Sequence, residues 1–189
     1  PPHYHTAVFV EYHGETEDAL DEALLEAGEI MADCGGDPDA TWMASGARER
    51  ERLRLFRHAL PEAVNLLIDE RRRAHPALTK LGTDMAVPDA RLEDVLALYN
   101  ADLNAARLDS VIFGHIGNNH LHVNILPRDP DEYAVGRALY LEWARRVVAW
   151  GGTVSAEHGI GKIKVALLRE MYGEKGIEEM RALKRLLDP

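Results

Sequence analysis

The segment GHIGNNHLHVNI, residues 114–125, places three histidines and two adjacent asparagines between apolar runs. A two-residue turn at Asn118-Asn119 predicts a β-hairpin with His115 directly opposite His122, because paired residues of a hairpin keep a constant sum of their numbers. Opposed side chains on neighbouring strands have Cβ atoms roughly 5 Å apart, so two imidazoles placed there can bind one metal ion. The segment therefore predicts a hairpin that carries metal ligands.

The alternation of residue types divides this hairpin into two faces. Apolar residues and a glycine occupy one face, which predicts packing against a core, and the histidines share the other face with Asn124. His120 lies on the same face as His122, where it is either a third imidazole ligand or a solvent-exposed residue beside the turn. The alternative for all three histidines is a half-exposed strand position without a ligand.

Composition predicts one compact domain over residues 1–189, because a chain of this length with 46% hydrophobic residues can bury one core but hardly two complete ones. The net charge of −10 argues against a nucleic acid or an acidic membrane as partner, since both select surfaces rich in lysine and arginine. The single cysteine, Cys34, excludes a disulfide framework and a CxxC site.

The sequence also bears on location. No apolar stretch approaches the ~20 residues that cross a bilayer, and the first residues do not resemble a signal peptide. We therefore expect no transmembrane segment and a cytoplasmic location, with peripheral membrane association of the full protein left open. The chain begins with Pro1 instead of methionine, which suggests an excised fragment or a processed product.

Hydrophobic periodicity predicts an α+β fold. Strands are expected at residues 5–12, at 42–43, at 83–87 and in the hairpin. Helices are expected over residues 16–34, in two stretches of 46–74 interrupted near Pro61, over 88–103, over 129–150 and from about residue 162 to 187. This order predicts a ferredoxin-like antiparallel or mixed sheet with helices packed on one side and helical insertions.

A second segment with chemical content is SAEHGIGK, residues 155–162, in which a carboxylate and an imidazole lie beside glycines. If the backbone turns here, Glu157 and His158 can serve one site. The carboxylate can complete a metal site with two histidines, and the imidazole can accept a proton near neutral pH. The alternative is a glycine loop that leads into a helix, with Glu157 near the helix N-terminus.

These two segments resemble the GHxGDGNLHxN and SxEHGIG signatures of FAD-linked oxidases and dehydrogenases that act on D-2-hydroxy acids, and their order and spacing match as well. The family is of the vanillyl-alcohol-oxidase type and includes D-lactate dehydrogenases, the glycolate oxidase flavoprotein subunit and D-2-hydroxyglutarate dehydrogenase. Two weaker segments also resemble it, LFRHALPEAVN around Arg57 and KLGTDMAVP around Lys80. The resemblance covers nearly the whole chain.

The resemblance implies that the chain is the C-terminal substrate or cap domain of such a flavoprotein, with a ferredoxin-like fold. The N-terminal FAD-binding domain is absent from this chain and is expected in a removed half or in a separate flavin-binding subunit. The implied reaction oxidises a D-2-hydroxy acid, such as lactate, glycolate or 2-hydroxyglutarate, to the 2-oxo acid. In this reaction the hydroxyl proton is removed while the α-hydrogen leaves as hydride to FAD, and the fragment alone is expected to be inactive.

Residue roles follow from the matching positions. The resemblance implies a divalent metal, commonly zinc or manganese, on His115, His122 and Glu157. It implies that His158 is the catalytic base and that Asn124, Arg57 and Lys80 bind the substrate, the two cations through its carboxylate.

The chain departs from the signature at the hairpin turn, where Asn118, Asn119 and His120 stand for Asp, Gly and Asn. Two other classes of function remain open at this point. One is a metal-dependent hydrolase that uses two histidines, one carboxylate and a bound water. The other is a noncatalytic ligand-binding module that has lost its metal.

Overall fold

The computed structural model describes residues 6–162 and 164–188. Its backbone separates into two compact units, residues 1–62 and residues 63–189. Helix α2 (Ala47–Arg71) begins in the first unit and ends in the second. The expectation of one domain over residues 1–189 stays a prediction.

The first unit contains α1 (Glu17–Asp33), the short 3-10 helix η1 (Pro38–Ala40) and the first part of α2. The helix expected over residues 16–34 is confirmed, and Thr16 caps it, because the Thr16 hydroxyl accepts from the Ala19 N–H at 3.2 Å. The predicted strands at residues 6–12 and 42–43 are wrong, and residue 5 lies outside the described residues. Neither segment belongs to the four-stranded sheet formed by the described strands, and residue type alone does not place a segment in a sheet.

Helix α2 continues through Pro61, so the predicted interruption there is wrong. Proline removes one backbone donor and strains the preceding turn, at a cost of about 3 kcal/mol. Arginine, glutamate, leucine and alanine dominate the flanking sequence, and these strong helix formers keep the helix continuous on both sides.

The second unit is built on a four-stranded antiparallel sheet with β4 (His120–Ile125) at its centre. On one side β4 pairs with β3 (Ser110–His115), and on the other with two short strands, β1 (Leu81–Gly82) and β2 (Met85–Ala86). Leu81 lies opposite Ile125 and Met85 opposite Leu121, so the register is the same on both sides of the interruption. The break between β1 and β2 is therefore a local distortion of one strand.

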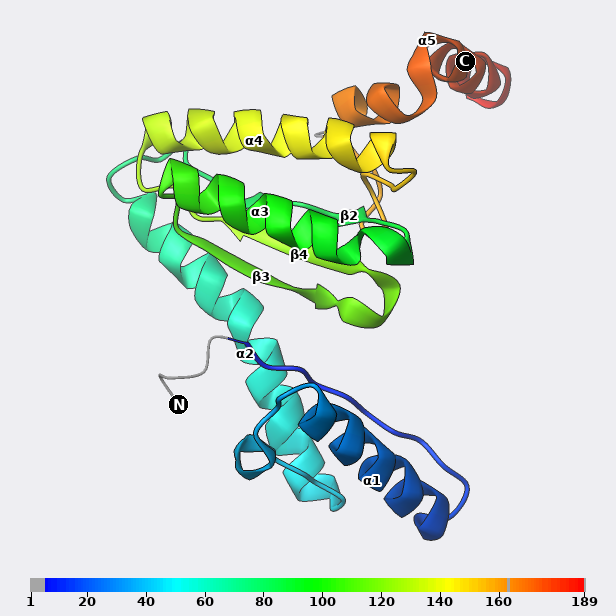
Figure 1. Ribbon diagram of the computed structural model, residues 1–189. Coiled ribbons are helices and arrows are strands. Elements are labelled where there is room, and N and C mark those ends of the chain that lie inside the picture. The colour runs from blue at the N-terminus through cyan, green and yellow to red at the C-terminus, as the bar shows by residue number, and fades with distance from the viewer. Residues whose placement is uncertain (1–5, 163, 189) are drawn as a thin grey trace. The chain divides into compact units, whose positions relative to one another are not determined.

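Two helices cover one face of this sheet, α3 (Leu92–Ala106) and α4 (Pro130–Ala149), as Figure 1 shows. The 3-10 helix η2 (Asp89–Arg91) precedes α3, and Thr153 forms a single antiparallel bridge to Ala86 after α4. The order of strand, helix, two strands, helix and bridge is that of the ferredoxin-like fold, with its last strand reduced to one residue pair. The expected α+β class is confirmed.

The hairpin is confirmed but its predicted register is wrong. His115 pairs with His120, and His122 pairs with Phe113. The turn is longer than two residues because a 3-10 turn, η3 (Ile116–Asn118), is followed by Asn119 in the left-handed region at φ 50°. The slip is two residues along β4, so every side chain stays on its predicted face.

The main core lies between the sheet and its two helices. Val123, Ile125, Trp143 and Ala144 have no solvent exposure at all. Helix α5 (Val165–Leu187) contributes Leu167 to this core and bends at Gly173, where φ is 65°. None of the described helices is both long enough and apolar enough to cross a membrane.

Candidate functional site

The face of the sheet turned away from α3 and α4 carries polar groups that are buried. On β4 these are His120, His122 and Asn124, and Asp84 lies opposite His122 in the interruption between β1 and β2. Buried polar side chains are stable only when their donors and acceptors are matched. Their partners therefore define what this face can do.

His122 is oriented by the distorted strand. The Thr83 hydroxyl, instead of the Thr83 carbonyl, accepts from the Val123 N–H at 2.9 Å. The freed Thr83 carbonyl lies 2.7 Å from His122 Nδ1. Because a carbonyl can only accept, Nδ1 carries the proton, and Nε2 of the neutral ring is left with a lone pair.

Glu157 brings its carboxylate to this lone pair. Oε1 lies 3.0 Å from His122 Nε2 and 3.2 Å from His158 Nε2, and Oε2 lies 3.6 Å from His115 Nε2. Burial raises the pKa of Glu157, but the hydrogen bond with His122 and the charges of the neighbouring histidines outweigh it, so this pKa is lowered. When His122 is neutral, its Nε2 and the Glu157 carboxylate are two acceptors that face each other, and a cation between them can satisfy both.

The donor set fits a divalent metal by its distances. Two ligand atoms about 2.1 Å from a zinc ion lie about 3.4 Å apart at the tetrahedral angle. The distances from Glu157 to His122 and His115, 3.0 Å and 3.6 Å, bracket that value. A tighter group, in which one ligand atom from each residue lies within 4.8 Å of the others, consists of Asp84, His122, Glu157 and His158 and does not include His115.

Asp84 has other partners that make it a poor metal ligand. Its Oδ2 accepts from Lys164 Nζ at 2.5 Å, from Ser155 Oγ at 2.8 Å and from the His158 N–H at 3.0 Å. Its Oδ1 accepts from the Glu157 N–H at 3.2 Å. A divalent ion on the same oxygens would lie beside the ammonium of Lys164, which like-charge repulsion opposes.

The role of Asp84 is instead to hold the loop that carries Glu157 and His158. The side chain is 1% exposed, and burial opposes its ionisation. The hydrogen bonds from Lys164, Ser155 and the two loop N–H groups outweigh this, so the pKa of Asp84 lies well below its usual value. The loop is turned as the sequence required, because both backbone amides point at one carboxylate.

His120 is buried, which removes the solvent-exposed alternative. The residue is 4% exposed. Its Nε2 lies 3.0 Å from Asp84 Oδ1, but the angles at this contact are not those of a hydrogen bond. Burial and the charge of His122 lower the pKa of His120, against the opposing charges of Glu157 and Asp84.

The other three predicted site residues belong to different parts of the chain. Asn124 is on the same face of β4, 3% exposed and opposite Gly82. Lys80 is half-buried and directly precedes β1. Arg57 belongs to the first unit, where its guanidinium lies over the ring of Phe9, 5.5 Å from the ring centre.

Four contributors to the cluster were not predicted: Thr83, Asp84, Ser155 and Lys164. Asp84 lies in the segment KLGTDMAVP and Ser155 in SAEHGIGK. A polar residue in a strand or loop that is otherwise buried could have indicated their role. Thr83 stands in the first segment too, and its hydroxyl frees the carbonyl that orients His122. Lys164 acts through a contact across the fold, which residue type does not encode.

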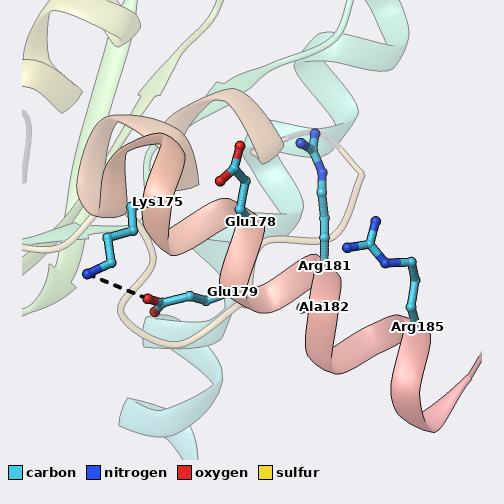
Figure 2. Close-up of a pocket in the computed structure, with 6 residues that line it drawn as sticks. All are labelled: Lys175, Glu178, Glu179, Arg181, Ala182 and Arg185. Atoms are coloured by element: carbon cyan, nitrogen blue, oxygen red, sulfur yellow. Dashed lines mark ion pairs between the residues drawn. The ribbon is translucent and has the colours of Figure 1, made fainter.

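A hollow elsewhere on the molecule offers no competing site. It lies along α5 and is open to solvent, and its side chains carry both charges, with Lys175 and Glu179 paired at 3.9 Å (Figure 2). A binding site for a small molecule needs enclosure and convergent polar groups. The lining residues all belong to this one helix: Lys175, Glu178, Glu179, Arg181, Ala182 and Arg185.

Comparison with known proteins adds an independent finding. The sequence model of a family described as "FAD linked oxidases, C-terminal domain" matches residues 1–189. The chain is 36% identical over 184 residues to a Danio rerio protein named probable D-lactate dehydrogenase, mitochondrial. This alignment covers 96% of the chain but only 35% of the Danio rerio protein.

Two further relatives are of bacterial origin. The chain is 33% identical over 137 residues to the glycolate oxidase subunit GlcD of Bacillus subtilis. The aligned region covers 68% of the chain and 29% of GlcD. The chain is 28% identical over 177 residues to a D-2-hydroxyglutarate dehydrogenase of Xanthomonas citri. Here the aligned region covers 92% of the chain and 35% of the relative. The chain thus spans about a third of the length of the relatives it matches.

Proposed function

We propose that this chain, which belongs to the family of C-terminal domains of FAD-linked oxidases, forms the metal- and substrate-binding part of an enzyme that oxidises a D-2-hydroxy acid. The product is the corresponding 2-oxo acid, and the acceptor is FAD held by the rest of the protein or by a separate subunit. The observation that supports this most is the position of Glu157, whose carboxylate lies within 3.6 Å of Nε2 of both His115 and His122.

We assign the metal to His115, His122 and Glu157. When bound, a divalent metal such as zinc or manganese lowers the pKa of the substrate hydroxyl, and FAD accepts the α-hydrogen with its electron pair. Thr83 holds His122 in the tautomer that leaves Nε2 free, and Asp84 holds the loop so that Glu157 faces both imidazoles. Buried orienting partners of this kind set both the affinity and the geometry of metal ligands.

His158 is the base in this proposal. Its Nε2 lies 3.2 Å from Glu157 Oε1, and its side chain is 63% exposed, which leaves the ring accessible to a substrate that enters from solvent. A neutral imidazole within reach of a substrate hydroxyl can act as a general base. The hydroxyl proton of the substrate therefore passes to Nε2 of His158.

Substrate recognition is assigned to an amide and two cations. Asn124 lies on the same face of β4 as the histidines, opposite Gly82, and a Cβ atom at Gly82 would lie only 3.2 Å from the Asn124 amide oxygen. Lys80 and Arg57 are assigned to the substrate carboxylate on the basis of the family resemblance. The cytoplasmic location stays a prediction, and four relatives carry the word mitochondrial in their names.

The test is anaerobic flavin reduction in the full-length protein that contains this chain. We expect D-lactate, glycolate or D-2-hydroxyglutarate to bleach the flavin absorbance, L-lactate to fail, and a metal chelator to slow the reaction. His158→Ala should slow flavin reduction by roughly 10²–10⁴-fold, the usual contribution of a general base. His58→Ala, at an exposed histidine of α2, is the matched control.

The outcomes also separate the alternatives. Chelator-sensitive ester or amide hydrolysis by a protein whose flavin no hydroxy acid reduces would favour the hydrolase. A protein without either activity would favour the noncatalytic module.

A further inference from the structure

We infer that His120 is a fourth protein ligand of the metal, through its Nδ1 atom. This inference rests on the proposed metal site of His115, His122 and Glu157 and adds to it a residue at which this chain departs from the family signature. The signature has asparagine at this position, so the additional ligand is a property of this chain.

The first observation is the position of the ring. His120 opens β4 on the same face as His122, and it lies directly opposite His115 on β3. The ring centre of His120 lies 4.3 Å from that of His122 and 6.0 Å from that of His115. Three imidazoles therefore stand side by side at one end of the hairpin, and all three approach the Glu157 carboxylate.

The second observation is the orientation of the two ring nitrogens. Nε2 of His120 lies 3.0 Å from Asp84 Oδ1, and Nδ1 lies 4.0 Å from Glu157 Oε2. With its proton on Nε2, toward the carboxylate of Asp84, the neutral ring presents the lone pair of Nδ1 to the site. A metal-bound histidine commonly directs its other N–H to a carboxylate or a backbone carbonyl, as His122 directs Nδ1 to the Thr83 carbonyl.

The third observation is that the burial of His120 is otherwise uncompensated. Only 4% of the residue is exposed, and Nε2 is buried without an aligned hydrogen bond in the part of the chain that the structure describes. Placing an imidazole in such a position is unfavourable unless both of its nitrogens have a function. Metal ligation gives Nδ1 a partner, and Asp84 Oδ1, 3.0 Å away, is the carboxylate toward which the proton of Nε2 is directed.

A fourth protein ligand changes the expected properties of the site. Three nitrogen ligands and one carboxylate favour zinc in a tetrahedral arrangement, which binds more firmly than a three-ligand site. The substrate hydroxyl must then enter as a fifth ligand or displace one of the four. His120 therefore strengthens metal retention in this chain relative to a variant with the asparagine of the signature.

The test uses cobalt(II) as a spectroscopic probe in the full-length protein. Wild type, His120→Asn, His122→Ala and the control His58→Asn are freed of metal and titrated with cobalt(II) while the visible absorption is recorded. If His120 is a ligand, His120→Asn binds cobalt(II) at least about 10-fold more weakly, and its visible bands weaken as water replaces nitrogen. The His58→Asn control matches wild type.

A second variant keeps the test decisive if His120→Asn folds poorly. Nδ1 is the ring nitrogen nearest the backbone, so the thiolate of His120→Cys has a similar reach. A thiolate bound to cobalt(II) gives a strong charge-transfer band in the near ultraviolet, which appears only if residue 120 coordinates the metal.

Each remaining outcome has a distinct meaning. Unchanged affinity and visible bands in His120→Asn, together with no charge-transfer band in His120→Cys, would overturn the role of His120 and leave the three-ligand site in place. If wild type and His122→Ala both fail to bind cobalt(II), the proposed metal site itself is refuted, and the role of His120 with it.

Discussion

The two faces of strand β4 are both buried, but they are stabilised in different ways. Leu121, Val123 and Ile125 face α3 and α4 and pack among apolar side chains. His120, His122 and Asn124 alternate with them and face a carboxylate-rich cluster that involves Asp84 and Glu157.

The difference shows how one strand can serve folding and chemistry at once. Burial on the apolar face gains free energy from the area removed from water, without any directional requirement. Burial on the polar face is unfavourable until each polar atom has a partner. Substitutions on the first face should therefore change the free energy of unfolding, and substitutions on the second should change the site.

The largest expected effect is that of Trp143→Ala, on the helix that covers the apolar face. Trp143 is fully buried and its ring packs 4.8 Å from that of Tyr99, centre to centre. Its loss should lower the free energy of unfolding by about 3–5 kcal/mol. Urea unfolding measures this loss, and unchanged metal affinity of the folded variant checks that the two faces are independent.

Asp84→Asn should weaken metal binding on the polar face without removing a metal ligand. We expect metal affinity to fall about 10–100-fold, because the loop that carries Glu157 loses its anchor. Asp109→Asn is the matched control, since Asp109 also forms a short ion pair, with Arg71 at 2.6 Å, away from the cluster. Equal metal affinity in the two variants would contradict the anchoring role of Asp84.

The same variant has a signature in the pH dependence of stability. Because folding lowers the pKa of Asp84 below its ordinary 3.8, the carboxylate stabilises the fold fully above about pH 4. This stabilisation is lost as the pH falls further, toward the folded pKa. The urea midpoint of wild type should therefore fall more steeply than that of Asp84→Asn as the pH drops below about 4.

The hairpin offers a test with a smaller effect on stability. A Cβ atom at Gly114 would lie 2.2 Å from the carbonyl oxygen of His120, so Gly114→Ala must push β3 away from β4. We expect a loss of about 1–3 kcal/mol, together with weaker metal binding as His115 moves. Gly117→Ala, which meets nothing within 4 Å, is the control and should be nearly neutral.

The smallest effect is expected at the start of α4, which contributes no residue to the histidine cluster. The Asp129 side chain accepts from the Glu132 N–H at 2.8 Å and caps the helix. Asp129→Ala should lower the free energy of unfolding by about 1 kcal/mol and leave metal affinity unchanged. A change in metal affinity here would show that helix packing and the polar face are coupled.

The sequence was sufficient for those parts of the fold that rest on local signals. The Thr16 and Asp129 caps and the alternation along β4 predicted two helices and both faces of the central strand. The strand predicted at residues 6–12 was wrong because residue type does not supply a hydrogen-bonded neighbour.

The site was predictable in part for the same reason. The face shared by His115 and His122 followed from alternation, whereas their register depended on the turn, and the αL conformation of Asn119 lengthened it. Asn119 is stable there because its side-chain amide donates to Asp89 at 2.5 Å. The anchoring by Asp84 and Lys164 joins residues 80 positions apart, which no local pattern encodes.

The most direct test of the central claim compares two adjacent residues of β4, His122→Ala and Val123→Ala, by metal content per chain and by urea unfolding of the metal-free protein. We predict that His122→Ala retains no stoichiometric metal while its apo-protein unfolds close to wild type. Val123→Ala should keep its metal and lose about 2 kcal/mol of stability. Stoichiometric metal in His122→Ala, or equal metal loss in both variants, would contradict the assignment of chemistry to the polar face of β4.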